Sequence, residues 1–119
     1  MYTNNNTTTA RTDVDECRDY ARNIAQELDA IALDGVNDDG EPCDIYDYAG
    51  ENALDVEYLL DSEKSLIGVM VYVTLGGPTC WIDSRRQEVV CHWGSASASW
   101  SITPETADAV TDAYRWAFE

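Results

Sequence analysis

Basic residues and histidine are scarce in this sequence. Of its 119 residues only 7 are lysine or arginine, Lys64 is the single lysine and His92 the single histidine, against 23 aspartates and glutamates. The resulting formal net charge of −16 repels phosphate groups, so it disfavours direct binding to nucleic acid or to an anionic membrane. Cations and basic protein surfaces are the partners that such a charge attracts.

Long apolar segments are also lacking. The longest apolar run, at 66–75, is far shorter than the roughly 20 residues that a membrane-spanning helix needs. The first residues, Met1-Tyr2-Thr3 followed by Asn and Thr, do not have the pattern of a signal peptide. We therefore expect a cytoplasmic protein.

Motifs for metal binding and catalysis are absent. The four cysteines include no Cys-x-x-Cys pair, so we expect no zinc site. An EF-hand alignment on Gly40 places Tyr46 where the bidentate glutamate should stand, and Gly76-Gly77-Pro78 lacks the lysine of a phosphate-binding loop. With one histidine and no nucleophile elbow, the sequence predicts no enzyme activity, no catalytic residue and no cofactor.

Two adjacent residues, Cys91 and His92, resemble a nucleophile and its base. Neighbours on a strand point to opposite faces, so we expect Cys91 to be buried and His92 to lie on the other face. Cys80 and Cys91 can stand opposite each other across a hairpin, close enough to bridge if the register allows. In a reducing cytoplasm we expect them to be free thiols.

The pattern of apolar residues predicts one domain over residues 12–119, after a disordered tail at 1–11. Thr12 is a good N-cap for a helix that Gly35 ends. Its apolar stripe recurs every three or four residues, and Tyr20, Ala25 and Ala32 widen it. The stripe consists of Val14, Cys17, Ala21, Ile24, Leu28 and Ile31.

The run at 66–75 predicts a central strand, because it is rich in β-branched residues and is followed by Gly76-Gly77-Pro78. Alternation places five aliphatic residues on one face, which we expect to be buried. They are Ile67, Val69, Val71, Val73 and Leu75. Strands are also predicted at 54–60, 79–83, 88–93 and 97–102.

Thr103 and Pro104 predict the start of a last helix. We expect its buried stripe to comprise Ala107, Val110, Tyr114, Ala117 and Phe118, with Arg115 in its last turn. Both helices need the same aliphatic sheet face. The sequence therefore predicts a two-layer α+β fold, an antiparallel sheet of about five strands flanked on one face by an N-terminal and a C-terminal helix.

Acidic residues are concentrated between Asp34 and Glu63, where eleven of thirty residues are acidic and none is basic. We expect an irregular segment through Gly50, then a strand whose outer face begins with Asp55 and Glu57. Exposed tyrosines among the acids would serve as anchors for a protein partner. The predicted partner-binding residues are Asp38, Asp39, Glu41, Asp44, Asp47, Tyr46, Tyr48, Asp55, Glu57, Asp61 and Glu63.

A resemblance narrows the kind of partner. The segment from Gly76 to Asp83, followed by Val90-Cys-His-Trp-Gly94, resembles part of small acidic proteins carried by phages and mobile elements of gut bacteria. The resemblance covers roughly 54–118, and the short acidic α+β format is similar to that of anti-CRISPR and antirestriction proteins. It implies an inhibitor that occupies the basic nucleic-acid channel of a Cas effector or restriction enzyme, in the host cytoplasm if the chain is phage-encoded.

Two other interpretations stay open. In the first, the chain is a non-catalytic structural or regulatory module whose acidity confers only solubility or salt adaptation. The presence of only one lysine is consistent with salt adaptation. The acidic segment at 34–51 also lies outside the resemblance, so the resemblance does not identify a contact surface there.

Overall fold

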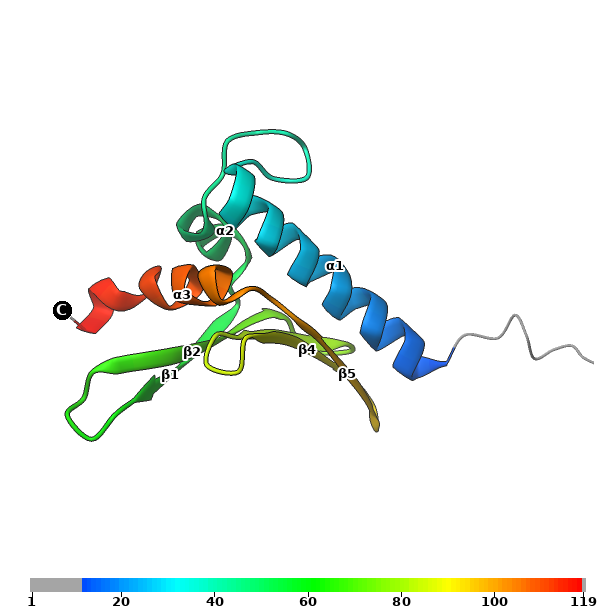
Figure 1. Ribbon diagram of the computed structural model, residues 1–119. Helices are drawn as coiled ribbons and strands as arrows, with labels where there is room; N and C mark the ends of the chain where they lie inside the picture. Colours follow the sequence, from blue (N-terminus) through cyan, green and yellow to red (C-terminus); the bar gives the residue numbers. More distant parts are fainter. Residues whose placement is uncertain (1–11, 119) are drawn as a thin grey trace, which may run out of the picture.

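The computed structural model describes residues 12–118 (Figure 1). Its elements, in chain order, are α1 (Asp13–Asp34), α2 (Ile45–Asn52), β1 (Asp55–Leu60), β2 (Leu66–Thr74), β3 (Thr79–Asp83), β4 (Glu88–Trp93), β5 (Ala96–Ser101), α3 (Pro104–Asp112) and the 3₁₀ helix η2 (Arg115–Phe118). The tail predicted at 1–11 lies outside the described residues.

The strands form one antiparallel sheet in the order β1-β2-β3-β4-β5, so each strand pairs with its neighbour in sequence. Helix α1 packs across β4 and β5, α3 lies against β2, and α2 packs on α3 and α1. Figure 1 shows the helices together on one side of the sheet. The predicted two-layer α+β architecture is confirmed.

Local signals set the bounds of α1. The Thr12 hydroxyl accepts a hydrogen bond from the Asp15 backbone N–H at 3.1 Å, and the Asp15 carboxylate accepts one from the Thr12 N–H at 3.2 Å. Gly35 has a φ of 71° and donates its N–H to the Ile31 carbonyl, which ends the helix. Most of the predicted stripe is buried, whereas Val14 and Tyr20 are exposed near the start of the helix and Ala32 is exposed near its end.

The core lies between α1 and the middle of the sheet. Val71, Ile82 and Val89 are cross-strand neighbours on β2, β3 and β4, and all three are buried together with Leu28 of α1. Burying a side chain of this kind stabilises the fold by about 1.5–3 kcal/mol. The predicted inner face of the central strand is thus confirmed at its middle.

The predicted burial is wrong at both ends of that strand. Ile67 and Leu75 are exposed, whereas Leu66 is buried. The pairing of β1 with β2 shifts register between Leu59 and Leu60, next to Leu66, and this irregularity interrupts the alternation. Leu75 follows the last residue of β2, beyond the part of the sheet that the helices cover.

A helix replaces part of the irregular segment predicted through Gly50. Asp44 caps α2 by accepting the Asp47 backbone N–H at 2.7 Å, and Asp47 accepts the Asp44 N–H in return. Ile45, Tyr48 and Ala49 then form a short buried stripe at helical spacing. The capping pair and the stripe together outweigh Gly50, which lies within the helix.

The last helix begins as predicted but ends early. The Thr103 hydroxyl accepts the Thr106 backbone N–H at 3.1 Å, with Pro104 at the first helical position. Helix α3 stops at Asp112 and η2 follows. Consequently Arg115 belongs to η2, and the end of the predicted stripe, Ala117 and Phe118, is exposed.

Buried polar groups tie α3 and α1 to their surroundings. The Ser84 hydroxyl accepts hydrogen bonds from the Val69 backbone N–H at 2.9 Å and from the Thr111 hydroxyl at 2.7 Å. The Asp29 carboxylate of α1 accepts from the Thr106 hydroxyl at 2.6 Å and from the Thr103 N–H at 3.1 Å. The buried hydroxyls of Ser84, Thr106 and Thr111 thus each have a partner, as buried polar groups require.

Cys80 and Cys91 form a disulfide between β3 and β4, which corrects the expectation of free thiols. The register places the two residues directly opposite each other, with Cα atoms 4.1 Å apart, and both are fully buried. Cys17 and Cys43 are free and buried. Burial, as the larger cause, and neighbouring acids raise the pKa of both free thiols.

Candidate functional site

The structure divides the predicted partner-binding acids into two groups. The loop–α2 acids lie in the connection after α1 and in the first turn of α2; they are Asp38, Asp39, Glu41, Asp44 and Asp47. The hairpin acids lie on β1 and in the turn to β2; they are Asp55, Glu57, Asp61 and Glu63.

The loop that carries the first three loop–α2 acids is closed by an isolated bridge between Val36 and Pro42. Inside it, the Asn37 side-chain oxygen accepts the backbone N–H groups of Asp39 and Glu41, each at 3.0 Å. These hydrogen bonds hold the backbone, and the carboxylates face solvent. The loop therefore presents acids from an ordered turn.

One acid that the sequence did not single out, Glu27 of α1, lies beside this loop. Burial, followed by the charges of Asp38 and Asp39, raises the pKa of the Glu27 carboxyl. The same surroundings raise the pKa of the Tyr48 hydroxyl, chiefly through burial and then through Glu27. Negative charge is thus dense enough here to disfavour further ionisation.

The two tyrosines predicted as exposed anchors differ. Tyr46 is 60% exposed, whereas Tyr48 is only 7% exposed and belongs to the core. Their positions on α2 explain the difference, because residues two apart on a helix face different directions. The prediction that Tyr48 is an exposed anchor is therefore wrong, and Tyr48 is a core residue. Tyr46 stays a candidate anchor, and it lines a hollow of about 310 Å³ together with Asp47 and Glu51.

The hairpin acids are presented by a regular strand and its turn. In the register of β1 and β2, Asp55 stands opposite Tyr72 and Glu57 opposite Met70, as the sequence predicted. The Tyr72 hydroxyl donates to a Glu57 carboxylate oxygen at 3.4 Å. Burial, followed by the charge of Glu57, raises the pKa of the Tyr72 hydroxyl.

The turn acids have different roles. The Asp61 carboxylate accepts the backbone N–H groups of Glu63 and Ser65, at 2.9 and 3.0 Å, and so shapes the turn. Glu63 is exposed. Asp61 is therefore both a structural residue and part of the acidic surface.

The two groups lie on different layers of the fold. In Figure 1 the loop and α2 lie above the sheet, on the side of the helices. The turn between β1 and β2 lies at the lower left end of the sheet. Asp55 and Glu57 share the outer sheet face with Tyr72 and Met70, on the side away from the helices. The molecule thus presents two separate acidic surfaces.

A row of rings crosses the outer face of the sheet beside the hairpin acids. The ring centroids of Tyr72 and Trp81 are 5.6 Å apart, and those of Trp81 and His92 are 5.0 Å apart. We call these three residues the aromatic row. The structure confirms the expectation that Cys91 is buried and that His92 faces the other way.

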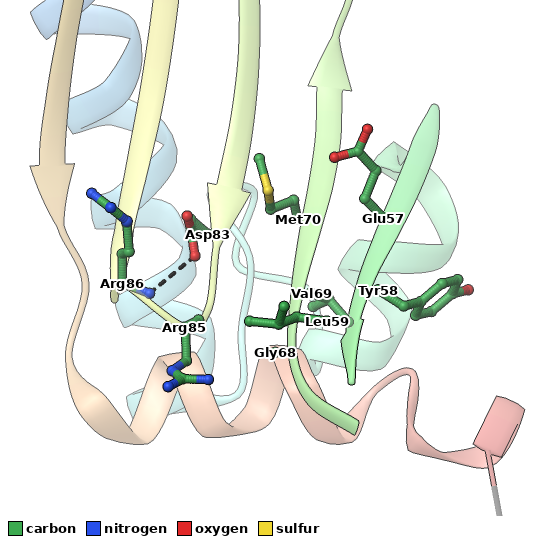
Figure 2. Close-up of a pocket in the computed structure, with 9 residues that line it drawn as sticks. All are labelled: Glu57, Tyr58, Leu59, Gly68, Val69, Met70, Asp83, Arg85 and Arg86. Carbon is green, nitrogen blue, oxygen red and sulfur yellow. Dashed lines mark hydrogen bonds between the residues drawn. The ribbon is translucent and has the colours of Figure 1, made fainter. Parts of the chain in front are cut away.

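A hollow of about 270 Å³ adjoins the same face, and Figure 2 shows nine residues that line it. Gly68 forms part of its floor, where a Cβ atom would lie only 2.8 Å from the Arg85 Cβ. Met70 and Leu59 supply apolar walls. Asp83 accepts the Arg86 backbone N–H at 3.0 Å, which holds the turn between β3 and β4 against one end of the hollow.

Three of the six basic side chains in the described chain are already paired. Arg18, Arg22 and Arg115 bind the acids three residues before them at 3.0–3.1 Å. Among residues 12–118, no acid between Asp34 and Glu63 forms an ion pair. The acids of both surfaces therefore have no ion-pair partner in the part of the chain that the structure describes, although Arg85 and Arg86 line the same hollow as Glu57.

Known proteins add nothing to this picture: comparison with protein-family models, with curated proteins and with solved structures found no match. Within residues 12–118, no group of three or more histidine, cysteine, aspartate or glutamate side chains is placed to hold a metal ion. No helix in the same range is both long and apolar enough to cross a membrane. The proposals below therefore rest on the residues of this chain.

Proposed function

We propose that this chain is an acidic protein-binding inhibitor, of the anti-CRISPR or antirestriction type, that blocks a basic nucleic-acid-binding site of a bacterial defence effector. The observation that carries the proposal is the acidic segment from Asp34 to Glu63, in which eleven of thirty residues are acidic and none is basic. Within the described chain these acids also have no ion-pair partner.

A basic nucleic-acid channel is the complement of such a surface. Arginine side chains that bind phosphate also bind carboxylate, because both anions accept two parallel hydrogen bonds from a guanidinium group. Carboxylates on one strand face, such as Asp55 and Glu57, repeat every ~6.7 Å, whereas each DNA strand carries a charge per ~3.4 Å. The strand alone is too sparse to imitate a duplex, so the turn acids must contribute.

The distribution of the other acids favours a second candidate, in which acidity confers only solubility or salt adaptation. Exposed acids also lie on α1 and α3, far from the hairpin in sequence; they include Asp13, Glu16, Glu105 and Asp108. A surface that is acidic on several sides is what solvation alone would produce. The two candidates differ in whether the position of the acids matters.

An inhibition assay with two variants of equal net charge separates these candidates. The site variant replaces Asp55, Glu57, Asp61 and Glu63 by Asn or Gln, and the control variant replaces Asp13, Glu16, Glu105 and Asp108 in the same way. DNA cleavage by purified Cas effectors and restriction enzymes is then measured with increasing amounts of each protein. We expect the site variant to inhibit at least about tenfold more weakly than the wild type, since charge pairs closed off in an interface each contribute more than exposed ones.

Inhibition that falls equally in both variants would mean that only the total charge matters. If the wild type inhibits none of the effectors, the inhibitor proposal itself fails. The expected place of action is the cytoplasm, where such effectors cut DNA.

A further inference from the structure

We propose that the outer face of the sheet, centred on Trp81, is the surface that receives an arginine side chain of the partner. This inference rests on the proposed function, because it takes the partner to be a basic protein. It selects the hairpin acids over the loop–α2 acids as the contact surface. It also adds aromatic stacking to the attraction between opposite charges.

The outer face is open in the part of the chain that the structure describes. All of the helices pack on the other side of the sheet (Figure 1), and Figure 2 looks onto the outer face with the helices behind it. Met70, Tyr72, Trp81 and Val90 are half-buried there by one another, and His92 is exposed. A face with this many large side chains and no covering layer is a contact surface for another molecule.

The charges around the aromatic row favour a cation. Asp55 is the cross-strand neighbour of Tyr72, and Tyr72 that of Trp81, so a carboxylate lies at one end of the row. One step along the strands, Asp83 of β3 and Glu88 of β4 are cross-strand neighbours on the same face, and Met70 of β2 separates them from Glu57 of β1. A guanidinium group over Trp81 would thus have Asp83 two residues along the same strand, at ~6.7 Å, and Asp55 two strands away, at ~9.6 Å.

The platform is held in place before any partner arrives. Tyr72 is fixed by its hydrogen bond to Glu57, and Trp81 is in contact with rings on both sides, at 5.6 and 5.0 Å. The disulfide joins β3 and β4 immediately beside Trp81 and His92. Little conformational entropy is therefore lost when a partner binds.

The molecule already contains one example of the proposed contact. On the helix side of the sheet, the Arg22 guanidinium lies 5.8 Å from the centre of the Trp100 ring while it also binds Asp19 at 3.1 Å. This is the combination of an indole face and a carboxylate that Trp81 and its neighbours offer to an incoming side chain. Arginine suits it better than lysine, because a planar guanidinium stacks on a ring and binds a carboxylate bidentately at the same time.

The hollow beside Gly68 extends the same surface. It lies beside Glu57 and Met70, one step along the strands from the aromatic row, and its apolar walls fit the aliphatic stem of a long side chain (Figure 2). Arg85 and Arg86 line its other end, so the cationic head of that side chain must lie toward Glu57. An aromatic sheet face can also stack nucleic-acid bases. The carboxylates that surround this row would repel the phosphates of such a strand, so we favour a protein segment.

Titration with three probes tests the inference. The probes are a nine-residue arginine peptide, a nine-residue lysine peptide and an oligothymidine of similar length, and the readout is the NMR signal of each indole N–H. The protein has four tryptophans, so four signals report on four positions, and wild-type protein is sufficient for this part. We expect the arginine peptide to shift the Trp81 signal most, the lysine peptide to shift it less, and oligothymidine not to shift it.

Two variants supply affinities. Trp81→Leu should bind the arginine peptide about tenfold more weakly, whereas Trp116→Leu, which removes a tryptophan that is 67% exposed on η2, should bind as the wild type does. Circular dichroism and thermal melting establish that both variants are folded.

The outcomes distinguish this inference from the proposed function. If the arginine peptide binds all three proteins equally without moving the Trp81 signal, the inference is wrong while binding to basic proteins stands. If oligothymidine moves the Trp81 signal, the row binds nucleic acid and the inference is overturned. If the arginine peptide does not bind the wild type at all, both the inference and the proposed preference for a basic partner fail.

Discussion

Gly68 and Arg85 show how a single missing side chain shapes the surface of Figure 2. The turn between β3 and β4 approaches β2 so closely that a Cβ on Gly68 would lie 2.8 Å from the Arg85 Cβ. The neighbouring atom belongs to the base of the side chain, so it cannot rotate away. We infer that glycine is required here for close approach, and not for an unusual backbone conformation.

Gly68→Ala should therefore lower the free energy of unfolding by about 1–3 kcal/mol, the usual cost of overpacking. Gly50→Ala is the matched control, because a Cβ there meets nothing within 4 Å and Gly50 lies within α2. Alanine should stabilise that helix by roughly 0.5–1 kcal/mol. Denaturant unfolding of both variants measures the difference, and equal stabilities would contradict the contact.

The ionisation of Glu27 is affected by two of the loop–α2 acids. Burial, with Asp38 and Asp39 nearby, raises its pKa in the folded protein above its ordinary value of 4.5. The folded chain therefore keeps this proton at a pH at which the unfolded chain has lost it. The stabilisation that follows is fully present below the unfolded pKa and is lost as the pH rises through the folded pKa.

Glu27→Gln should remove this loss of stability at higher pH, because glutamine does not ionise. Relative to the wild type, the variant should gain melting temperature at about pH 7 and much less at about pH 4, because the wild-type carboxyl is largely protonated there. Asp15 supplies an internal reference of opposite sign, since hydrogen bonds from Thr12 and then Arg18 lower its pKa. Parallel melting curves of wild type and variant across this range would show that Glu27 is not coupled to the loop.

At the scale of elements, the bridge between β3 and β4 is the feature that changes most from the sequence-based expectation. Unfolded in denaturant without reductant, each chain should expose two reactive thiols, Cys17 and Cys43. With reductant, all four cysteines should react. Titration with a thiol-specific chromogenic reagent counts them, and a variant with Cys80→Ser and Cys91→Ser should give two under both conditions. Four thiols without reductant would contradict the bridge.

The elements differ in how far the sequence predicts them. Both ends of helix α1 could be predicted because they depend on local signals. Thr12 caps the first turn with its hydroxyl, and Gly35 ends the helix with a left-handed backbone conformation. Helix α2 could not, because eight residues containing Gly50 give too short a pattern to outweigh the flanking turn residues. Leu66 and Ile67 were assigned to the wrong faces because a register shift is set by pairing across the hairpin.

The candidate site was predictable only in part. The acids are evident from composition, and the outward direction of Asp55 and Glu57 follows from alternation. The contacts of Trp81 with Tyr72 and His92 depend on the register of three strands, which the lengths of the turns determine. Tyr48 was misplaced for a related reason, since the helix that buries it was not expected.

Across the whole molecule, the two layers divide the surface into parts with different properties. The helical side carries the loop–α2 acids around Tyr46, and the sheet side carries the hairpin acids beside the aromatic row. A net charge of −16 gives both sides a field that attracts cations and basic surfaces. Aromatic contacts then make one side more specific than the other, which is why we assign the partner to the sheet.

The central claim is that the hairpin acids occupy the site at which an effector holds DNA, and a competition measurement tests it most directly. The affinity of a purified, inhibited effector for its DNA is measured at increasing concentrations of this protein. The account predicts that the apparent Kd for DNA rises in proportion to the protein concentration. It also predicts that this effect weakens steeply as salt shortens the Debye length from ~30 Å to ~8 Å. An unchanged Kd for DNA, or an effect that the variant lacking the four hairpin acids reproduces in full, would contradict the account.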